Sequence, residues 1–138
     1  MWVQLSKTME FSAAHLLRDH PGNCRNLHGH TWKLEVTVEA EVQEPSGLSM
    51  DFKSLKHLIQ VHVINRLDHS YLNNELSIPN PTAEHLCVWI WNALHQVLNE
   101  EGVMLHSITL WESSDSKCYI DRGHFLLGQP DQEWPDGR

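Results

Sequence analysis

Three histidines and one cysteine near the start of the chain are of the residue types that hold a metal ion. His28 and His30 stand two residues apart around Gly29, His15 lies upstream, and Cys24 comes four residues before the pair. Imidazole nitrogens are good zinc ligands, and residues i and i+2 of an extended segment point to the same side. His28 and His30 can therefore bind one ion if the chain enters a strand here.

Two kinds of zinc site fit these four residues. Cys24 together with the three histidines would form a closed structural site. The three histidines alone, with Cys24 beside the metal, would form an open catalytic site in which the thiolate reacts. The chain has 11 histidines, so a chance pairing is a third reading, and the spacing alone does not decide among them.

A second group of polar residues has the types needed for proton transfer and ligand binding. Asp68 precedes His69 in a polar loop, and a carboxylate beside an imidazole can orient it for general acid–base catalysis. Glu112 ends an apolar segment, where it is either a solvated strand end or a buried acceptor. As a buried acceptor it would bind two parallel N–H groups, such as those of a pterin or guanine.

The segment after the histidine pair has the period of a strand with one buried face. Apolar and polar residues alternate strictly over residues 31–42. The apolar positions are Trp32, Leu34, Val36, Val38, Ala40 and Val42. If the register runs back through Gly29, His28 and His30 lie on this apolar face, at its entrance.

Three further strands and two helices are predicted from the rest of the chain. The strands are residues 3–14, 104–112 and 117–126. A helical period covers residues 52–66, with Asp51 as the N-cap. A second helix opens at Pro81-Thr82 and is stopped by Gly102.

This order of elements predicts an α+β fold. Two helices can cover only one face of a four-stranded antiparallel sheet with the order ββααββ. The open sheet edges favour oligomerisation, with sheets joined edge to edge. We expect one domain over residues 1–127 and an irregular tail over residues 128–138, which has two prolines and few apolar residues.

The composition excludes several classes of partner. The 138-residue chain is 41% hydrophobic with a net charge of −8, which argues against a nucleic-acid partner because phosphates require a basic surface. No apolar run approaches a membrane span, and the N-terminus has no signal-peptide pattern. Three scattered cysteines fit free thiols, so we expect a cytoplasmic protein.

Taken together, these residues resemble the 6-pyruvoyl-tetrahydropterin synthase family, which includes 6-carboxytetrahydropterin synthases. The resemblance runs in family order from about residue 8 to 122. The matching stretches are FSAAH (11–15), CRNLHGHTW (24–32), MDF (50–52), RLDHSYLN (66–73), NPTAE (80–84) and WE (111–112). The ordered set is highly specific, whereas a single one of these motifs would be weak.

The resemblance implies a T-fold assembled into an oligomeric barrel, a trimer or a dimer of trimers. It implies zinc on His15, His28 and His30, and Cys24 as the proton acceptor. Further implied roles are a relay pair supplied by a neighbouring subunit, Asp68 and His69, and pterin binding by Glu112 with help from Thr82.

The resemblance also implies a substrate, 7,8-dihydroneopterin triphosphate. Three residues separate Cys24 from His28, a short gap similar to that of the carboxy-forming branch. That branch forms 6-carboxy-5,6,7,8-tetrahydropterin, acetaldehyde and triphosphate for queuosine and other deazapurine pathways. Two alternatives are a pyruvoyl-forming synthase and a non-enzymatic zinc module. Candidates for binding the triphosphate are Arg18, Arg25 and Lys33.

Overall fold

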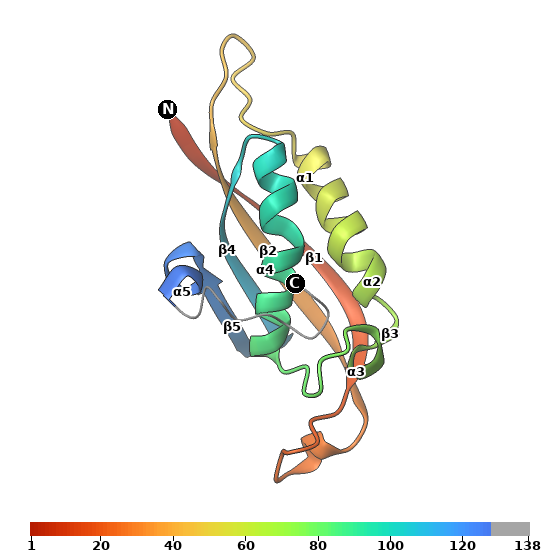
Figure 1. Ribbon diagram of the computed structural model, residues 1–138. Coiled ribbons are helices and arrows are strands. Elements are labelled where there is room, and N and C mark those ends of the chain that lie inside the picture. Colours follow the sequence, from red (N-terminus) through yellow and green to blue (C-terminus); the bar gives the residue numbers. More distant parts are fainter. Residues whose placement is uncertain (128–138) are drawn as a thin grey trace.

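A twisted β-sheet with its two long helices on one face forms the protein (Figure 1). The structure is a computed structural model that describes residues 1–127. The sheet order is β3-β1-β2-β4-β5. Its strands are β1 (Trp2–His15), β2 (His28–Glu41), β3 (Ser70–Tyr71), β4 (Met104–Ser113) and β5 (Ser116–Asp121).

The long hairpin of β1 and β2 confirms the predicted strand pattern. The two strands are antiparallel, and Phe11 lies opposite Trp32 while His15 lies opposite His28. The strand begins at His28, so the register does run back through Gly29. The alternating apolar residues of β2 are buried beneath the helices, because one face of a pleated strand carries every second side chain.

Both predicted helices form. The first combines α1 (Phe52–Ile59), a π-helical turn η2 (Gln60–Ile64) and α2 (Asn65–Leu67). It begins at Asp51, whose Oδ1 accepts a hydrogen bond from the backbone N–H of Lys53 at 2.8 Å. This bond satisfies one of the unpaired donors of the first turn.

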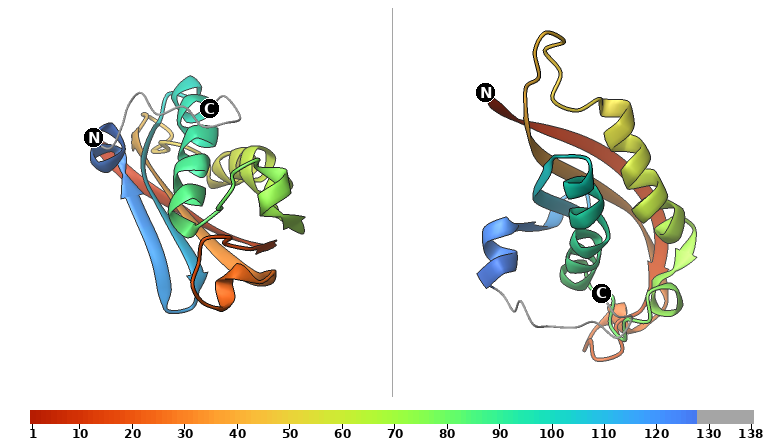
Figure 2. Two further views of the ribbon diagram at one scale, coloured as in Figure 1. Left: turned by 60° about the horizontal axis from the view of Figure 1, so that its bottom comes forward. Right: turned by 45° about the horizontal axis from the view of Figure 1, so that its top comes forward.

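The second helix, α4 (Ala83–Glu100), lies across β4 and β5 (Figure 2). Thr82 caps its start, with Oγ1 accepting from the backbone N–H of His85 at 3.1 Å. Gly102 follows its end with φ of +79°, a conformation that glycine adopts without strain. The short helical turns η1 (Asn23–Arg25) and α3 (Leu72–Glu75) lie in the connections.

Two features differ from the sequence prediction. The sheet has five strands, because β3 pairs in parallel with Ala13 and Ala14 of β1. A strand of two residues is too short to show any alternation. Residues 122–126 are helical, within α5 (Arg122–Leu127), so the predicted strand over 117–126 is wrong after Asp121. Oδ1 of Asp121 accepts from the backbone N–H of His124 at 2.9 Å, and this cap favours a turn over continued strand.

The two faces of the sheet differ in chemistry. The helix-covered face holds the core, which includes Trp32, Trp89 and Phe11. The other face is polar, and on it Ser6 and Thr37 form a hydroxyl pair at 2.7 Å. In the part of the chain described here, no helix has the length and apolar character needed to cross a membrane. The predicted tail of residues 128–138 lies outside the described residues.

Candidate metal centre and its surroundings

The three candidate histidines converge at one end of the sheet. His15 is the last residue of β1, and His28 and His30 stand at the start of β2, on the helix-covered face. Their ligand atoms all lie within 4.8 Å of one another. This geometry follows from the register, because His15 lies directly opposite His28 across the hairpin.

Backbone carbonyl groups fix the orientation of two of the rings. Nδ1 of His15 donates to the carbonyl oxygen of Pro81 at 2.9 Å, and Nδ1 of His28 donates to that of Asn26 at 2.7 Å. A carbonyl oxygen only accepts, so a neutral ring in either position has its proton on Nδ1 and its lone pair on Nε2. Metal-binding histidines are usually held by such a second hydrogen bond.

The Nε2 atoms of His15, His28 and His30 are buried and have no hydrogen-bond partner among the described residues. A buried polar atom without a partner costs free energy unless something else satisfies it. Three imidazoles whose ligand atoms lie this close together fit a metal ion, and we therefore identify this cluster as a candidate metal centre.

Burial favours the neutral form of two rings of the cluster, His15 and His30. Burial lowers the pKa of His15 below its ordinary value, and this effect exceeds the opposing one of the hydrogen bond to Pro81. Burial also lowers the pKa of His30, although the nearby Glu112 carboxylate acts in the other direction. Neutral imidazoles have the free lone pairs that metal binding needs.

Trp32 forms the inner wall of the metal centre. Its ring packs edge-on against His15 and His30, with centroid distances of 5.3 Å to each. Nε1 of Trp32 donates to the carbonyl oxygen of Ala13 at 3.3 Å, which holds the indole in place. Trp32 is fully buried, as its place among the apolar positions of the strand predicted.

Glu112 lies beside the metal centre. Its Oε1 is 3.8 Å from Nε2 of His30, and its side chain is 31% exposed. It stands in β4, where the pairing with β5 shifts register between Trp111 and Ser113. A partly exposed carboxylate in this position can accept hydrogen bonds from a ligand bound next to the metal.

Asp68 and His69 form a hydrogen-bonded pair at the edge of β1. Oδ1 of Asp68 accepts from the backbone N–H of Ser12 at 2.9 Å, and Oδ2 lies 3.0 Å from Nδ1 of His69. The Ser12 N–H is the main reason that the pKa of Asp68 is lowered, and His69 lowers it further. His69 has a left-handed backbone with φ of +59°, stabilised by its N–H bond to the Ser12 carbonyl at 2.6 Å.

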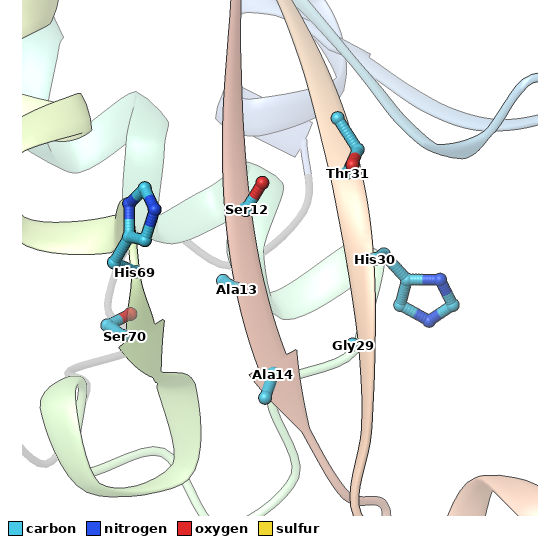
Figure 3. A pocket seen from close by; sticks show the side chains of 8 residues that line it. All are labelled: Ser12, Ala13, Ala14, Gly29, His30, Thr31, His69 and Ser70. Atoms are coloured by element: carbon cyan, nitrogen blue, oxygen red, sulfur yellow. The ribbon is translucent and has the colours of Figure 1, made fainter.

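The structure does not bring His69 to the metal centre of its own chain. A shallow hollow of about 520 Å³ on the outer face of the sheet is lined by Ser12, Thr31 and His69, and also by His30. Figure 3 shows the His69 ring beside β1, while the ring of His30 points away on the far side of β2. The side chain of His69 is 84% exposed, so it is available to another molecule.

Cys24 is partly exposed in the turn η1. Among the described residues, the cluster of ligand atoms consists of those of the three histidines and does not include the Cys24 sulfur. This arrangement matches the open site better than the closed one.

Of the proposed phosphate-binding residues, Lys33 packs its ammonium group 4.7 Å from the centroid of the Trp111 ring. Arg18 and Arg25 are exposed.

Sequence reasoning missed the groups that orient the rings. The carbonyl groups of Asn26 and Pro81 are backbone atoms, which residue type does not reveal. It also missed Asn73 and Asn80, whose side-chain amides bond to the loop that carries Cys24. Their only sequence signal was their position inside the matching stretches 66–73 and 80–84.

The fold and the three-histidine cluster define a class of protein: an α+β T-fold chain with a candidate metal centre at the end of its sheet. Residues 4–123 match the family model of 6-pyruvoyl tetrahydropterin synthase, and the chain belongs to that family.

Individual relatives agree with this assignment. The chain is 39% identical over 121 residues to a 6-carboxy-5,6,7,8-tetrahydropterin synthase of Synechocystis, covering 84% of this chain and 90% of the relative. It is 31% identical over 138 residues to the 6-pyruvoyl tetrahydrobiopterin synthase of Homo sapiens, covering 88% of this chain and 92% of that relative. Among solved structures, 6-pyruvoyl tetrahydropterin synthase of Caenorhabditis elegans has a TM-score of 0.78 at 24% identity, and the match covers 88% of this chain and 96% of that one.

Proposed function

We propose that this chain is a zinc-dependent carboxy-forming pterin synthase. The reaction converts 7,8-dihydroneopterin triphosphate and one water to 6-carboxy-5,6,7,8-tetrahydropterin, acetaldehyde and triphosphate, and it would supply queuosine or another deazapurine pathway. The observation that carries the proposal is the convergence of three unpartnered Nε2 atoms beside the Glu112 carboxylate. The Synechocystis relative and the three-residue gap between Cys24 and His28 favour the carboxy-forming branch.

The donor set fits zinc. His15, His28 and His30 offer three neutral nitrogen ligands, the usual number in a catalytic zinc site with one open position. A zinc ion held there would supply Lewis acidity to the hydroxyl groups of the substrate side chain.

The remaining residues would bind the pterin and move protons. Glu112 would accept two charge-assisted hydrogen bonds from the amino-pyrimidine edge and fix the ring, with Thr82 assisting. The thiolate of Cys24 would remove a proton from the side chain of the substrate. His69, oriented by Asp68, would transfer protons on the other face of that side chain.

The exposure of His69 on the outer face supports a site shared between chains. The relay pair would enter the metal centre of a neighbouring copy in a homo-oligomer, a trimer or a dimer of trimers. The free cysteines fit a protein of the reducing cytoplasm.

Product analysis tests the proposed reaction. Pure protein loaded with zinc is incubated with 7,8-dihydroneopterin triphosphate, and the products are identified by mass. We expect equal amounts of acetaldehyde and the 6-carboxy product. A pyruvoyl product with triphosphate and no acetaldehyde would establish the alternative chemistry, which the human relative favours. No turnover at all would favour a non-enzymatic zinc module.

A further inference from the structure

The loop that carries Cys24 joins the two strands of the metal centre. We call residues 16–27 the Cys24 loop; they run from the end of β1 to the start of β2. The backbone N–H of Leu17 donates to the carbonyl oxygen of Cys24 at 2.8 Å, which ties the cysteine to the first residues of the loop. The position of the thiol therefore depends on what holds residues 16–19.

The side chain of Asn73 holds the start of this loop. Its Oδ1 accepts from the backbone N–H of Leu16 at 3.0 Å, and its Nδ2 donates to the Leu16 carbonyl oxygen at 2.9 Å. One amide thus binds both backbone groups of one residue, as a neighbouring strand would. The strand β3 pairs with Ala13 and Ala14, and the Asn73 amide continues this pairing along the chain at Leu16.

Asn80 holds two residues further along the loop, Arg18 and Asp19. Its Oδ1 accepts from the backbone N–H of Arg18 at 2.9 Å, and its Nδ2 donates to Oδ2 of Asp19 at 2.8 Å. The residue after Asn80 is Pro81, whose carbonyl oxygen orients the His15 ring. The same short segment therefore contacts both the Cys24 loop and a candidate metal ligand.

We infer that Asn73 and Asn80 are positioning residues that set the Cys24 thiol relative to the metal centre. This inference deepens the proposed function, because it rests on Cys24 acting as the base. Proton removal depends on the distance between base and substrate, and a misplacement of about 1 Å can cost roughly a hundredfold in rate. The two amides fix the loop by bonds that no other residue type of that length can fully replace.

Exchanging the side chains of Asp19 and Asn80 tests the role of Asn80. The single variant N80D places two carboxylates together and removes the donor to Asp19, although an oxygen remains for the Arg18 N–H. The double variant D19N/N80D restores one amide and one carboxylate, with the hydrogen bond reversed. We expect N80D to lower kcat by about ten- to a hundredfold with KM and metal content unchanged. The double variant should recover to within about threefold of the wild type.

Asn73 has a matched control next to it. N73D removes the donor to the Leu16 carbonyl and should lower kcat to a similar extent. N74D makes the same chemical change at an exposed position of α3, and its kcat should match that of the wild type. Equal kcat values for N73D, N80D and the wild type, all fully metallated and folded, would overturn the inference. A double variant that regains thermal stability without regaining kcat would also overturn it.

A second measurement does not depend on turnover. Peptide mapping after timed exposure to iodoacetamide gives the alkylation rate of Cys24 alone. We expect the rate to rise at least about threefold in N73D and N80D, as the loop loosens, and to return in the double variant. An unchanged rate would overturn the inference. If the wild type has no turnover, the proposed function fails, and these rates alone decide whether the amides position Cys24.

Discussion

At the scale of single residues, the metal centre owes its geometry to hydrogen bonds made outside it. The carbonyl groups of Pro81 and Asn26 fix the rings of His15 and His28, and the Nε2 atoms of all three histidines are buried. Cys24 lies outside that set of ligand atoms. A mutation of Cys24 can therefore test whether metal binding needs the thiol.

We predict that Cys24→Ala keeps the metal and loses activity. The variant should retain one zinc per chain by metal analysis, while turnover falls by roughly a hundredfold or more, the usual scale for a general base. The variant with His15, His28 and His30 all replaced by alanine is the control, and it should bind no zinc. Loss of zinc from Cys24→Ala would instead show that the thiol is a fourth ligand.

We predict that Glu112→Gln weakens pterin binding without affecting the metal. Glutamine keeps the size and one acceptor but presents an N–H group to an N–H group of the ligand. An unpaired buried donor costs about 1–3 kcal/mol, so binding of a pterin product should weaken by roughly tenfold or more. Fluorescence titration measures the affinity. Near-normal affinity would mean that the ring is held elsewhere.

Acid should destabilise the metal-free protein through His15. Burial lowers the pKa of this ring below its ordinary value of 6.5. Below that pH the unfolded chain binds a proton that the folded chain does not, so the free energy of unfolding falls as the pH drops. The loss continues until the lowered pKa is reached. Urea unfolding between pH 7 and 5 measures the slope.

Two histidine variants separate this effect from general acid sensitivity. His15→Gln removes one of two rings whose pKa is lowered by burial and should reduce the pH slope of the metal-free protein, while His30 keeps part of it. His57→Gln makes the same change at an exposed position of α1 and is the control for the substitution itself. Equal slopes in all three proteins would contradict the role given to His15.

At the scale of elements, alternation and capping residues made the fold predictable. The strict alternation over residues 31–42 indicated the buried face of β2, and its backward register placed His28 and His30 correctly. Asp51 and Thr82 marked the starts of both helices, because their side-chain oxygens satisfy the first free N–H groups. Both kinds of signal involve residues close together in the chain, so they can be recognised from the sequence alone.

Features that depend on distant contacts were not predictable in this way. The strand β3 exists because Ser70 and Tyr71 lie along β1, and a pair of residues has no period of its own. The π-helical turn η2 interrupts a helix whose apolar spacing looked regular. The hydrogen bonds of the Asn73 and Asn80 side-chain amides join segments more than 50 residues apart in sequence. Each of these depends on tertiary packing rather than on residue type.

The two helix caps lead to different predictions. Asp51→Ala and Thr82→Ala should each lower the free energy of unfolding by about 1 kcal/mol, the usual cost of losing an N-cap oxygen. Only Thr82→Ala should also weaken pterin binding, because Thr82 is proposed to assist Glu112. Thr82→Ser keeps the capping oxygen and should restore both properties. Unchanged pterin affinity in Thr82→Ala would leave Thr82 as a cap alone.

At the scale of the whole molecule, His69 and the three-histidine cluster lie on different sides of the sheet. The metal centre lies on the helix-covered face, whereas His69 is exposed beside β1 on the outer side of the sheet (Figure 3). In the described part of the chain, β3 covers the edge of β1 at Ala13 and Ala14, and β5 forms the opposite edge. Such edges can pair with other copies, which would bring His69 of one chain near the metal centre of the next.

Mixed oligomers should therefore recover activity from two inactive variants. Cys24→Ala has an intact relay pair, and His69→Ala has an intact thiol. If each site takes Cys24 from one chain and His69 from its neighbour, some sites of a mixed oligomer contain both groups. The two pure variants are unfolded together, refolded, and assayed against each variant refolded alone. Native mass spectrometry of differently tagged chains checks that exchange has occurred. Activity no higher than that of the separate variants, despite proven exchange, would place Cys24 and His69 in the site of a single chain and would contradict the shared site.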